Sequence, residues 1–253
     1  MSSQVDAAEP TRRERQRQAT LEEIVAVSRR LLTDPAGLSL RAVAQQMGIT
    51  APALYRYVAS YQDLVYLISD DIDRENAARI AAARDTQPDD DPAAQIICAS
   101  IAFRRWALSH REEFGLVFAN PVTAKRHDHQ AMKEEQTGHV FTELLFRLWL
   151  KHQFPLPDLA DLDPAVVQSL DDPAVPAKVE QVPEEAKALL WIFMKSWMAL
   201  YGTVTLEVFG HCDPRIIESG ALFRAMLESQ SDILGIRGEL PRLLPMIEKE
   251  MAG

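Results

Sequence analysis

Residues 37–67 read GLSLRAVAQQMGITAPALYRYVASYQDLVYL, which is the pattern of two short helices joined by a tight turn. Apolar residues at positions 40, 43, 44 and 47 have the spacing that gives the first helix one apolar face. Gly48 follows that helix, where a left-handed residue ends a helix at least cost. Thr50 is a good N-cap for the second helix, and Pro52 is tolerated in its first turn. The stretch therefore predicts a helix-turn-helix.

The second of these helices is expected to turn a small, aromatic and basic surface outward. Leu54 and Val58 lie four residues apart, so they share one face and return the helix to the core. The residues left partly or wholly outside that face are Ala51, Pro52, Ala53, Tyr55, Arg56 and Tyr57. We interpret this surface as one that fits a groove of nucleic acid, because arginine and tyrosine side chains contact phosphates and bases. The alternative is an ordinary helical hairpin with solvated polar residues.

Residues from about 20 to 72 resemble the DNA-binding domain of the TetR (tetracycline-repressor-like) family of bacterial transcription regulators. The resemblance rests on a long first helix, Gly-Leu-Ser-Leu, Val-Ala-x-x-Met-Gly-Ile, Ala-Leu-Tyr-Arg-Tyr-Val, and Ser60-x-x-x-Leu64 at the start of a fourth helix. It implies an all-α fold, with an N-terminal three-helix helix-turn-helix domain and a C-terminal helical ligand-binding and dimerisation domain. The residues expected to contact DNA are Arg41, Thr50, Ala51, Pro52, Ala53, Tyr55, Arg56, Tyr57 and Tyr61. Tyr61 is a departure, because the family usually carries a phosphate-binding lysine just after this serine.

The charge of the chain is distributed unevenly. The formal charge of the 253 residues is −10, which by itself argues against binding a polyanion. Residues 10–60, however, carry a formal charge of +4, which leaves −14 for the remainder. A basic N-terminal module on an acidic body is expected when only one end of a protein meets DNA. Four arginines before or at the start of the first helix are candidates for phosphate or minor-groove contacts, or form a solvated tail: Arg12, Arg13, Arg15 and Arg17.

Several classes of function find no support in the sequence. The two cysteines, Cys98 and Cys212, are far apart with apolar neighbours, which indicates a reducing compartment and buried thiols. The polar N-terminus and the lack of an uninterrupted apolar run of about 18 residues predict a cytoplasmic protein with no membrane partner. No nucleophile motif or glycine-rich phosphate loop is present, so we expect no catalytic residues, no cofactor and no enzyme. The Arg-His-Asp-His sequence at residues 126–129 lacks further metal ligands and favours a solvated loop.

The chain is expected to have four parts. These are a disordered tail at residues 1–10, the helix-turn-helix domain at 11–62, an effector-binding and dimerisation domain at 63–236, and an extension at 237–253. Beyond the first domain, helices are predicted at residues 61–84, 92–109, 111–119, 128–151, 184–210, 214–234 and 243–251. A short helix is predicted at residues 163–170, inside a segment rich in proline and aspartate.

The helices predicted at residues 184–210 and 214–234 are strongly apolar, and the first is apolar nearly all round. Such a helix is buried on several sides, either inside its own chain or by a partner chain. We interpret the two helices as half of a four-helix homodimer interface, which would set two recognition helices about one turn of DNA or more apart. Charges placed at Leu222 and Phe223 are then expected to split the dimer.

The C-terminal half has a weaker resemblance to the TetR subgroup that is named for a Trp, His and Gly signature. It rests on His110-Arg-Glu-Glu-Phe114-Gly-Leu-Val-Phe118-Ala-Asn-Pro121-Val and on Trp197-x-x-x-Tyr201-Gly202, where tyrosine stands in place of the signature histidine. In the family, the helices after the first domain enclose a ligand cavity. The residues expected to line an apolar cavity here, with a place in the core as the alternative for each, are Phe103, Trp106, Phe141, Leu145, Trp149, Trp191, Met194 and Met198.

Two interpretations follow from these observations. The first is a homodimeric transcription regulator, a repressor that binds a palindromic double-stranded DNA operator and is released by a small apolar or aromatic effector of unknown identity. A ligand that shifts the fourth helix would change the separation of the two recognition helices. The cavity for it is expected among the helices that contain residues 68–72, 103–106, 141–149 and 191–198. The second is a helical small-molecule-binding or catalytic protein whose helix-turn-helix no longer binds DNA.

Overall fold

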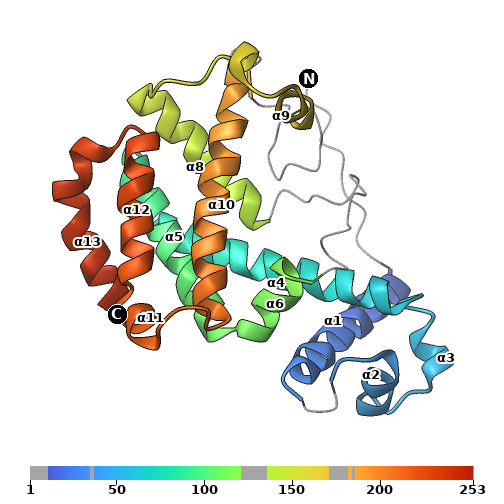
Figure 1. Ribbon diagram of the computed structural model, residues 1–253. Coiled ribbons are helices and arrows are strands. Elements are labelled where there is room, and N and C mark those ends of the chain that lie inside the picture. The colour runs from blue at the N-terminus through green and yellow to red at the C-terminus, as the bar shows by residue number, and fades with distance from the viewer. Residues whose placement is uncertain (1–10, 35–36, 121–135, 171–181, 184–185, 253) are drawn as a thin grey trace. The chain divides into compact units, whose positions relative to one another are not determined.

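The computed structural model describes residues 11–34, 37–120, 136–170, 182–183 and 186–252, and these residues form helices and no strand (Figure 1). The all-α fold expected from the sequence is confirmed. The chain divides into two compact units, Met1–Asp71 with Leu116–Ala124, and Ile72–Gly115 with Lys125–Gly253. Two helices cross the division: α4 (Tyr61–Arg84) and α6 (Arg111–Phe118) each contribute residues to both units.

The first unit contains α1 (Arg12–Leu32), α2 (Leu40–Gln46), α3 (Ala51–Leu54) and the first part of α4. Local capping fixes where these helices begin. The Thr11 hydroxyl accepts from the Glu14 amide and the Glu14 carboxylate accepts from the Thr11 amide, while the Ser39 hydroxyl accepts from the Ala42 amide. Gly48 follows α2 with a φ of +67°, so the predicted left-handed turn residue is confirmed. The core of this unit includes Ile24, Val25, Val27, Leu31, Val43, Ala44, Leu54, Val58, Leu64, Val65 and Ile68.

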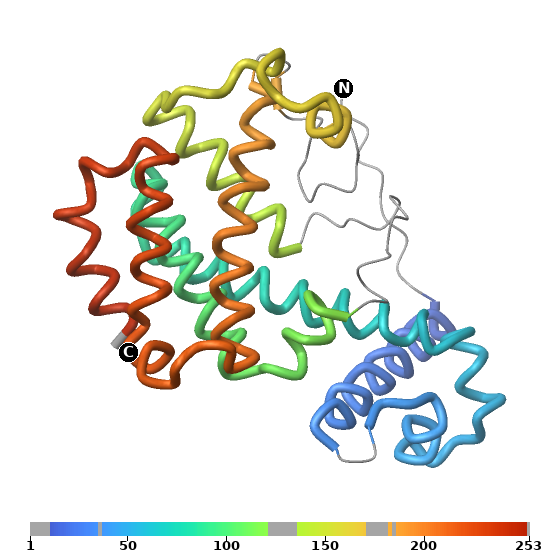
Figure 2. Tube along the Cα trace, viewed as in Figure 1, coloured from blue at the N-terminus to red at the C-terminus, as the bar shows by residue number. Residues whose placement is uncertain are grey.

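In the second unit, α5 (Pro92–Ser109) is the central helix. It packs against α8 (Thr137–His152), α10 (Ala188–Val208) and α13 (Leu240–Ala252), and α12 (Ala221–Ile233) packs on α10 and α13 (Figure 2). Because α5 has neighbours on several sides, most of its residues are buried, from Pro92 to Ala107. The described residues of this unit also form parts of α4 and α6 and the shorter elements η2 (Leu159–Asp161), α9 (Pro164–Ser169), α11 (Pro214–Ser219) and η5 (Arg237–Glu239).

The prediction of a single helix at residues 214–234 is wrong, because two helices, α11 and α12, occupy this stretch and are separated at Gly220. This glycine has a φ of +63°, in the left-handed region that favours glycine, and the Gly220 amide donates to the Ile217 carbonyl as a helix C-cap. The predicted helix at 243–251 is present as the longer α13, which buries Leu243 and Ile247. Cys98 is buried as predicted, whereas Cys212 is only half-buried.

Some predicted features lie outside the described residues. They include the tail at residues 1–10, the Arg-His-Asp-His sequence at 126–129 and the first part of the helix predicted at 128–151. Within the described residues, α10 is long and apolar enough, by length and composition, to cross a membrane. The sequence has no uninterrupted apolar run of about 18 residues in this helix, because Lys195 and Glu207 interrupt it. Core helices of soluble proteins pass the same test, and α10 buries Phe193, Leu200 and Val204 within the second unit.

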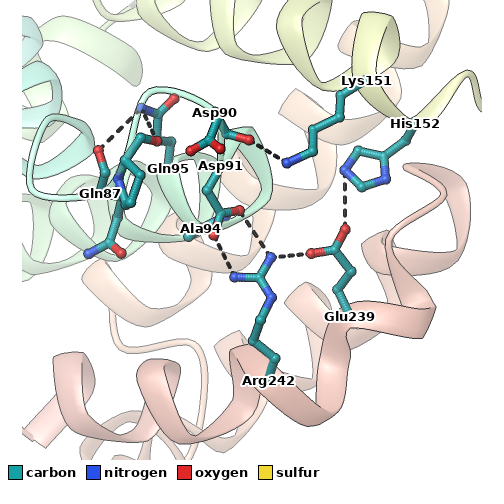
Figure 3. Close-up of polar contacts among 10 residues, drawn as sticks. Gln87, Asp90, Asp91, Ala94, Gln95, Lys151, His152, Glu239 and Arg242 are labelled. Atoms are coloured by element: carbon teal, nitrogen blue, oxygen red, sulfur yellow. Dashed lines mark hydrogen bonds and ion pairs between the residues drawn. The ribbon is translucent and has the colours of Figure 1, made fainter.

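The C-terminal helix α13 is tied to the start of α5 by a network of charged groups (Figure 3). Asp91 caps α5 by accepting from the Ala94 amide, and it also receives two hydrogen bonds from Arg242, at 2.5 and 3.0 Å. Burial opposes ionisation of Asp91, but these hydrogen bonds outweigh it, so the pKa of Asp91 is lowered. Glu239 bonds to Arg242 and lies 3.3 Å from His152 at the end of α8. The network therefore joins α5, α8 and the C-terminal extension.

A buried ion pair joins α5 to α10. The Arg104 guanidinium donates to Glu207 at 2.6 and 3.3 Å and to the Ile217 carbonyl of α11 at 2.7 Å, and it lies 5.3 Å from the centre of the Phe223 ring on α12. Glu207 is 0% exposed. Burial raises the pKa of the Glu207 carboxyl, and the hydrogen bond and charge of Arg104 oppose this rise. One arginine therefore fixes four helices and neutralises the only charge that α10 buries among the described residues.

Replacing Arg104 with leucine should destabilise the protein by about 3–5 kcal/mol, because Glu207 is left buried without its counter-charge. The double variant Arg104→Leu/Glu207→Leu should recover most of that loss. Urea unfolding at pH 7 measures both values. An acid whose pKa is raised in the folded state favours folding below its unfolded pKa and loses that contribution as the pH rises. The defect of Arg104→Leu should therefore shrink as the pH falls from 7 toward 5. An equal defect in the single and double variants would contradict this account.

Candidate nucleic-acid interface and ligand pocket

The recognition segment is α3 followed by a further turn of backbone. The Tyr57 and Val58 amides donate to the Leu54 carbonyl at 2.9 and 3.2 Å, so the chain keeps turning after α3 ends. Leu54 and Val58 are buried, at 1% and 3% exposure, as the spacing predicted. Thr50 occupies the N-cap position, but its side chain makes no capping hydrogen bond. These contacts hold the segment in place by one face and leave the other face to solvent.

The predicted contact residues mostly lie on that open face. Tyr55 is 52% exposed, and Arg41, Thr50, Ala51, Pro52 and Arg56 are also exposed. Ala53 and Tyr57 are half-buried. Tyr61 is exposed at the first residue of α4, immediately after Ser60, whose hydroxyl accepts from the Asp63 amide and caps the helix. An exposed tyrosine hydroxyl there can donate to a phosphate, although it brings no charge.

Arg17 is a residue of this surface whose position the sequence did not reveal. Its guanidinium lies 5.6 Å from the centre of the Tyr57 ring and donates to the Arg56 carbonyl at 3.5 Å. Arg17 comes from α1, so it connects the start of the first helix to the recognition segment and adds a positive charge beside Tyr57. The sequence showed a cluster of arginines before and within the first helix, but only the packing of α1 singles out Arg17.

The second unit contains a half-open pocket of about 50 Å³ between α5, α8, α10 and α12. Its wall is mostly apolar: Ile96, Ile97, Phe141, Leu145, Phe193, Trp197, Leu200, Met226, Leu227, Leu234 and Ile236. Four lining residues are polar, namely Ser100, Ser196, Gln230 and Ser231, and none of the lining side chains is charged. An apolar pocket with a few convergent polar groups is the usual form of a small-molecule site.

Two of the predicted ligand-binding residues, Phe141 and Leu145, line this pocket. The other six, Phe103, Trp106, Trp149, Trp191, Met194 and Met198, do not line it. Phe103 and Trp106 are buried instead, and Met198 is 55% exposed. No residue of α4 lines the pocket, whereas α12, which the sequence had not assigned to a cavity, forms one side. One feature of the sequence could have pointed to α12. The polar Gln230 has the helical spacing that places it on the same face as the apolar residues at positions 223, 227 and 234.

An aromatic cluster adjoins the pocket. Phe103 is at its centre, with ring centroids 5.6 Å from Trp197, 6.2 Å from Phe141 and 6.1 Å from Phe114 of α6. Phe114 also stacks on Tyr201 at 6.2 Å. Phe141 and Trp197 belong to both the pocket and the cluster, so contacts through Phe103 connect the pocket wall to Phe114 of α6. Packed cores respond to side-chain shifts as units.

Comparison with known proteins places these features in a family. Residues 96–230 match the model of the tetracyclin repressor-like C-terminal domain. HTH-type transcriptional regulators of Mycobacterium tuberculosis (Rv1816) and Mycobacterium bovis (Mb1846) are each 27% identical over 209 residues, which is 80% of this chain and 87% of each relative. A solved structure of a regulatory protein, SCO4313, superposes with a TM-score of 0.61 and 26% identity over 87% of this chain and 98% of its own.

Two neighbouring residues of the recognition segment should respond differently to truncation. Leu54→Ala should destabilise the first unit by about 2–5 kcal/mol, because it removes a fully buried side chain and leaves a cavity. Tyr55→Ala, the matched control, should change stability by less than about 0.5 kcal/mol, because the tyrosine is half-exposed. Hydrogen exchange of the α1 and α2 amides measures the stability of this unit. A larger loss of protection in Tyr55→Ala than in Leu54→Ala would contradict the packing described above.

Proposed function

Because the chain belongs to the tetracyclin repressor-like (TetR) family and is a DNA-binding transcription regulator, we propose that it is a cytoplasmic homodimeric repressor. In this proposal it binds a palindromic operator and leaves it when a small, apolar or aromatic effector binds the second unit. The observation that carries the proposal is the recognition segment, which is anchored by Leu54 and Val58 and exposes Tyr55 and Arg56 beside Arg17. Exposed basic and phenolic groups on a short helix suit phosphate and base contacts.

The proposed dimer surface is an apolar stripe on α10. Met198 and Leu206 of α10 are exposed, as is Phe209, which caps the helix; with Gly202 they recur at intervals of three and four residues along one face. The opposite face, which includes Leu200 and Val204, is buried. A Cβ added at Gly202 would meet no atom within 4 Å, so a partner helix could approach closely there. Exposed apolar stripes of this kind mark contact surfaces with other chains.

The proposed interface differs from the one expected from the sequence. Phe223 was expected to face the partner, but it is 0% exposed inside the second unit, beside Arg104. Leu222 is half-buried. A charge at Phe223 would therefore unfold the chain rather than split a dimer. The α10 stripe replaces it in the proposal, because it combines apolar character with exposure.

We also propose that the chain belongs to the subgroup with the Trp, His and Gly signature. Trp197 and Tyr201 stack at a centroid distance of 6.2 Å, and Tyr201 stacks on Phe114 of α6.

The proposed release from DNA uses two helices, α4 and α6, which both have residues in the effector unit and in the DNA-binding unit. A ligand releases the repressor only if it binds the DNA-incompetent arrangement more tightly, by about 1–3 kcal/mol for a typical coupling.

Arg56→Ala should weaken operator binding by about 1–3 kcal/mol and relax the preference at one base position, if Arg56 contacts a guanine edge with two hydrogen bonds. Fluorescence anisotropy on operator and random duplexes at one salt concentration measures both effects. An equal loss on both duplexes would reduce Arg56 to a phosphate contact. If the wild-type protein bound no duplex at all, a helical small-molecule-binding protein would replace the repressor proposal.

The double variant Met198→Glu/Leu206→Glu should be monomeric, because pairing would bury charges without partners. Operator affinity should fall with it, since each monomer loses the tethered second half-site. The control is Leu150→Glu, at an equally exposed leucine on α8, which should remain dimeric. Sedimentation velocity distinguishes the two. A dimeric double variant, with normal circular dichroism, would exclude the α10 stripe as the interface.

A further inference from the structure

The pocket between α5, α8, α10 and α12 carries two buried polar atoms that are not satisfied. Among the residues that the structure describes, Ser196 Oγ and Gln230 Oε1 are shielded from solvent and have no hydrogen-bond partner. Both side chains line the pocket, one from α10 and the other from α12. The other two polar residues of the wall are satisfied within their own helices. The Ser100 hydroxyl donates to the Ile96 carbonyl at 2.8 Å, and the Ser231 hydroxyl donates to the Glu228 carbonyl at 2.6 Å.

An unpaired polar atom in an apolar wall costs folding free energy, so such atoms are rare unless a ligand or solvent molecule pairs with them. Phe193 and Leu200 lie one helical turn from Ser196, Leu227 lies one turn from Gln230, and all three apolar residues line the pocket. A hydroxyl can donate and accept, and an amide offers a carbonyl and an NH₂ group. The two side chains therefore match a ligand group that both donates and accepts one hydrogen bond.

The wall also limits the charge and size of the ligand. None of the lining side chains is ionisable, so a carboxylate or ammonium group would lose its hydration without gaining a counter-charge. The volume of about 50 Å³ corresponds to a few water molecules, since one water needs roughly 10–15 Å³ by the same kind of measure. Met226 lines the pocket, and a flexible methionine can move aside for a small ring. A single ring is therefore a better match than a polycyclic molecule.

We propose that the effector of this protein is a small neutral molecule with an apolar body and one hydroxyl group, of the phenol or short-alcohol class. Its hydroxyl bonds to Gln230 and Ser196, and its apolar body lies against Phe141, Phe193 and Trp197. This inference rests on the proposed function, because it names the chemistry of the ligand that would release the regulator from DNA. The apolar wall alone would not distinguish an alcohol from a hydrocarbon. Ser196 and Gln230, the two polar anchors, provide that distinction.

Isothermal titration of the full-length protein with phenol, toluene and benzoate tests the proposal without DNA. Phenol and toluene have the same shape, so they differ mainly in the hydroxyl. Phenol should bind about tenfold more tightly than toluene, which is the effect of one net hydrogen bond, and benzoate should not bind measurably. Gln230→Leu and Ser196→Ala should each reduce this preference, and Gln230→Leu should remove most of it while leaving toluene binding intact. Both variants remove an unsatisfied polar atom, so they should fold.

Two further variants separate the polar anchors from the space around them. Met226→Ala enlarges the pocket without changing its polar atoms, so it should tighten phenol binding and keep the preference over toluene. Ser219→Ala, at an exposed serine of α11 outside the pocket, should leave all three titrations unchanged. Equal binding of phenol and toluene, unaltered preference in Gln230→Leu, or no binding of any probe to the wild type and Met226→Ala would overturn the proposal.

Operator binding is measured separately, by anisotropy with and without saturating phenol. Phenol that binds through Gln230 and also releases DNA supports the ligand chemistry and the repressor mechanism together. If the protein binds operator DNA but no probe shows the hydroxyl preference, the ligand inference fails and the regulator function stands. If the hydroxyl preference is found but no DNA is bound, the repressor proposal fails, and with it the assignment of this molecule as a releasing effector.

Discussion

The burial of α5 is the constraint on which the second unit depends. Its first turn is capped by Asp91, which also binds Arg242 and so holds the C-terminal helix α13. Near its middle, Phe103 is surrounded by aromatic rings from α6, α8 and α10. Arg104 then pairs with the buried Glu207 and reaches the α11 backbone. Ion pairs and aromatic contacts along α5 thus fix its neighbouring helices, and the pocket lies beside it, lined by residues of α5, α8, α10 and α12.

The apolar helix α10 presents two different surfaces to its surroundings. One surface faces the rest of the second unit: Val204 is buried in the core, and Ser196, Trp197 and Leu200 line the pocket. The other is the exposed stripe that contains Met198 and is assigned to the proposed dimer. Because one rigid helix would carry both the ligand contacts and the partner contacts, a ligand that moves α10 would alter the dimer and, through it, the spacing of the two recognition segments.

The first unit relies on much less packing. Its recognition helix has only four residues, so Leu54 and Val58 must fix the orientation of the whole segment. Short helices are marginal by themselves, and their stability comes from burying one face. The arrangement leaves Tyr55 and Arg56 on the surface, while Arg17 bonds to the backbone of the segment from α1. The surface proposed to meet DNA is therefore held from behind, by the buried Leu54 and Val58 and by Arg17.

The sequence by itself determined the features that arise from neighbouring residues. The helix-turn-helix was predictable because Gly48, Thr50 and the spacing of Leu54 and Val58 act within one or two turns of backbone. The tertiary structure decided what each apolar face would meet. Periodicity shows that Phe223 and Leu227 share a face, but not that this face is buried inside their own chain.

Sequence pattern alone also could not assign the side chains of the ligand pocket and of the recognition surface. Six of the residues expected to line a cavity are elsewhere, because aromatic and methionine side chains are equally suited to a core, a pocket or an exposed stripe. Composition cannot choose among these three environments. Ser196 and Gln230 were identified only by their surroundings, since a serine or a glutamine has no particular role until packing shields it. Arg17 was one of four candidate arginines, and its contact with Tyr57 distinguished it from the others. Local backbone chemistry thus fixed the elements, and long-range packing fixed which side chains meet.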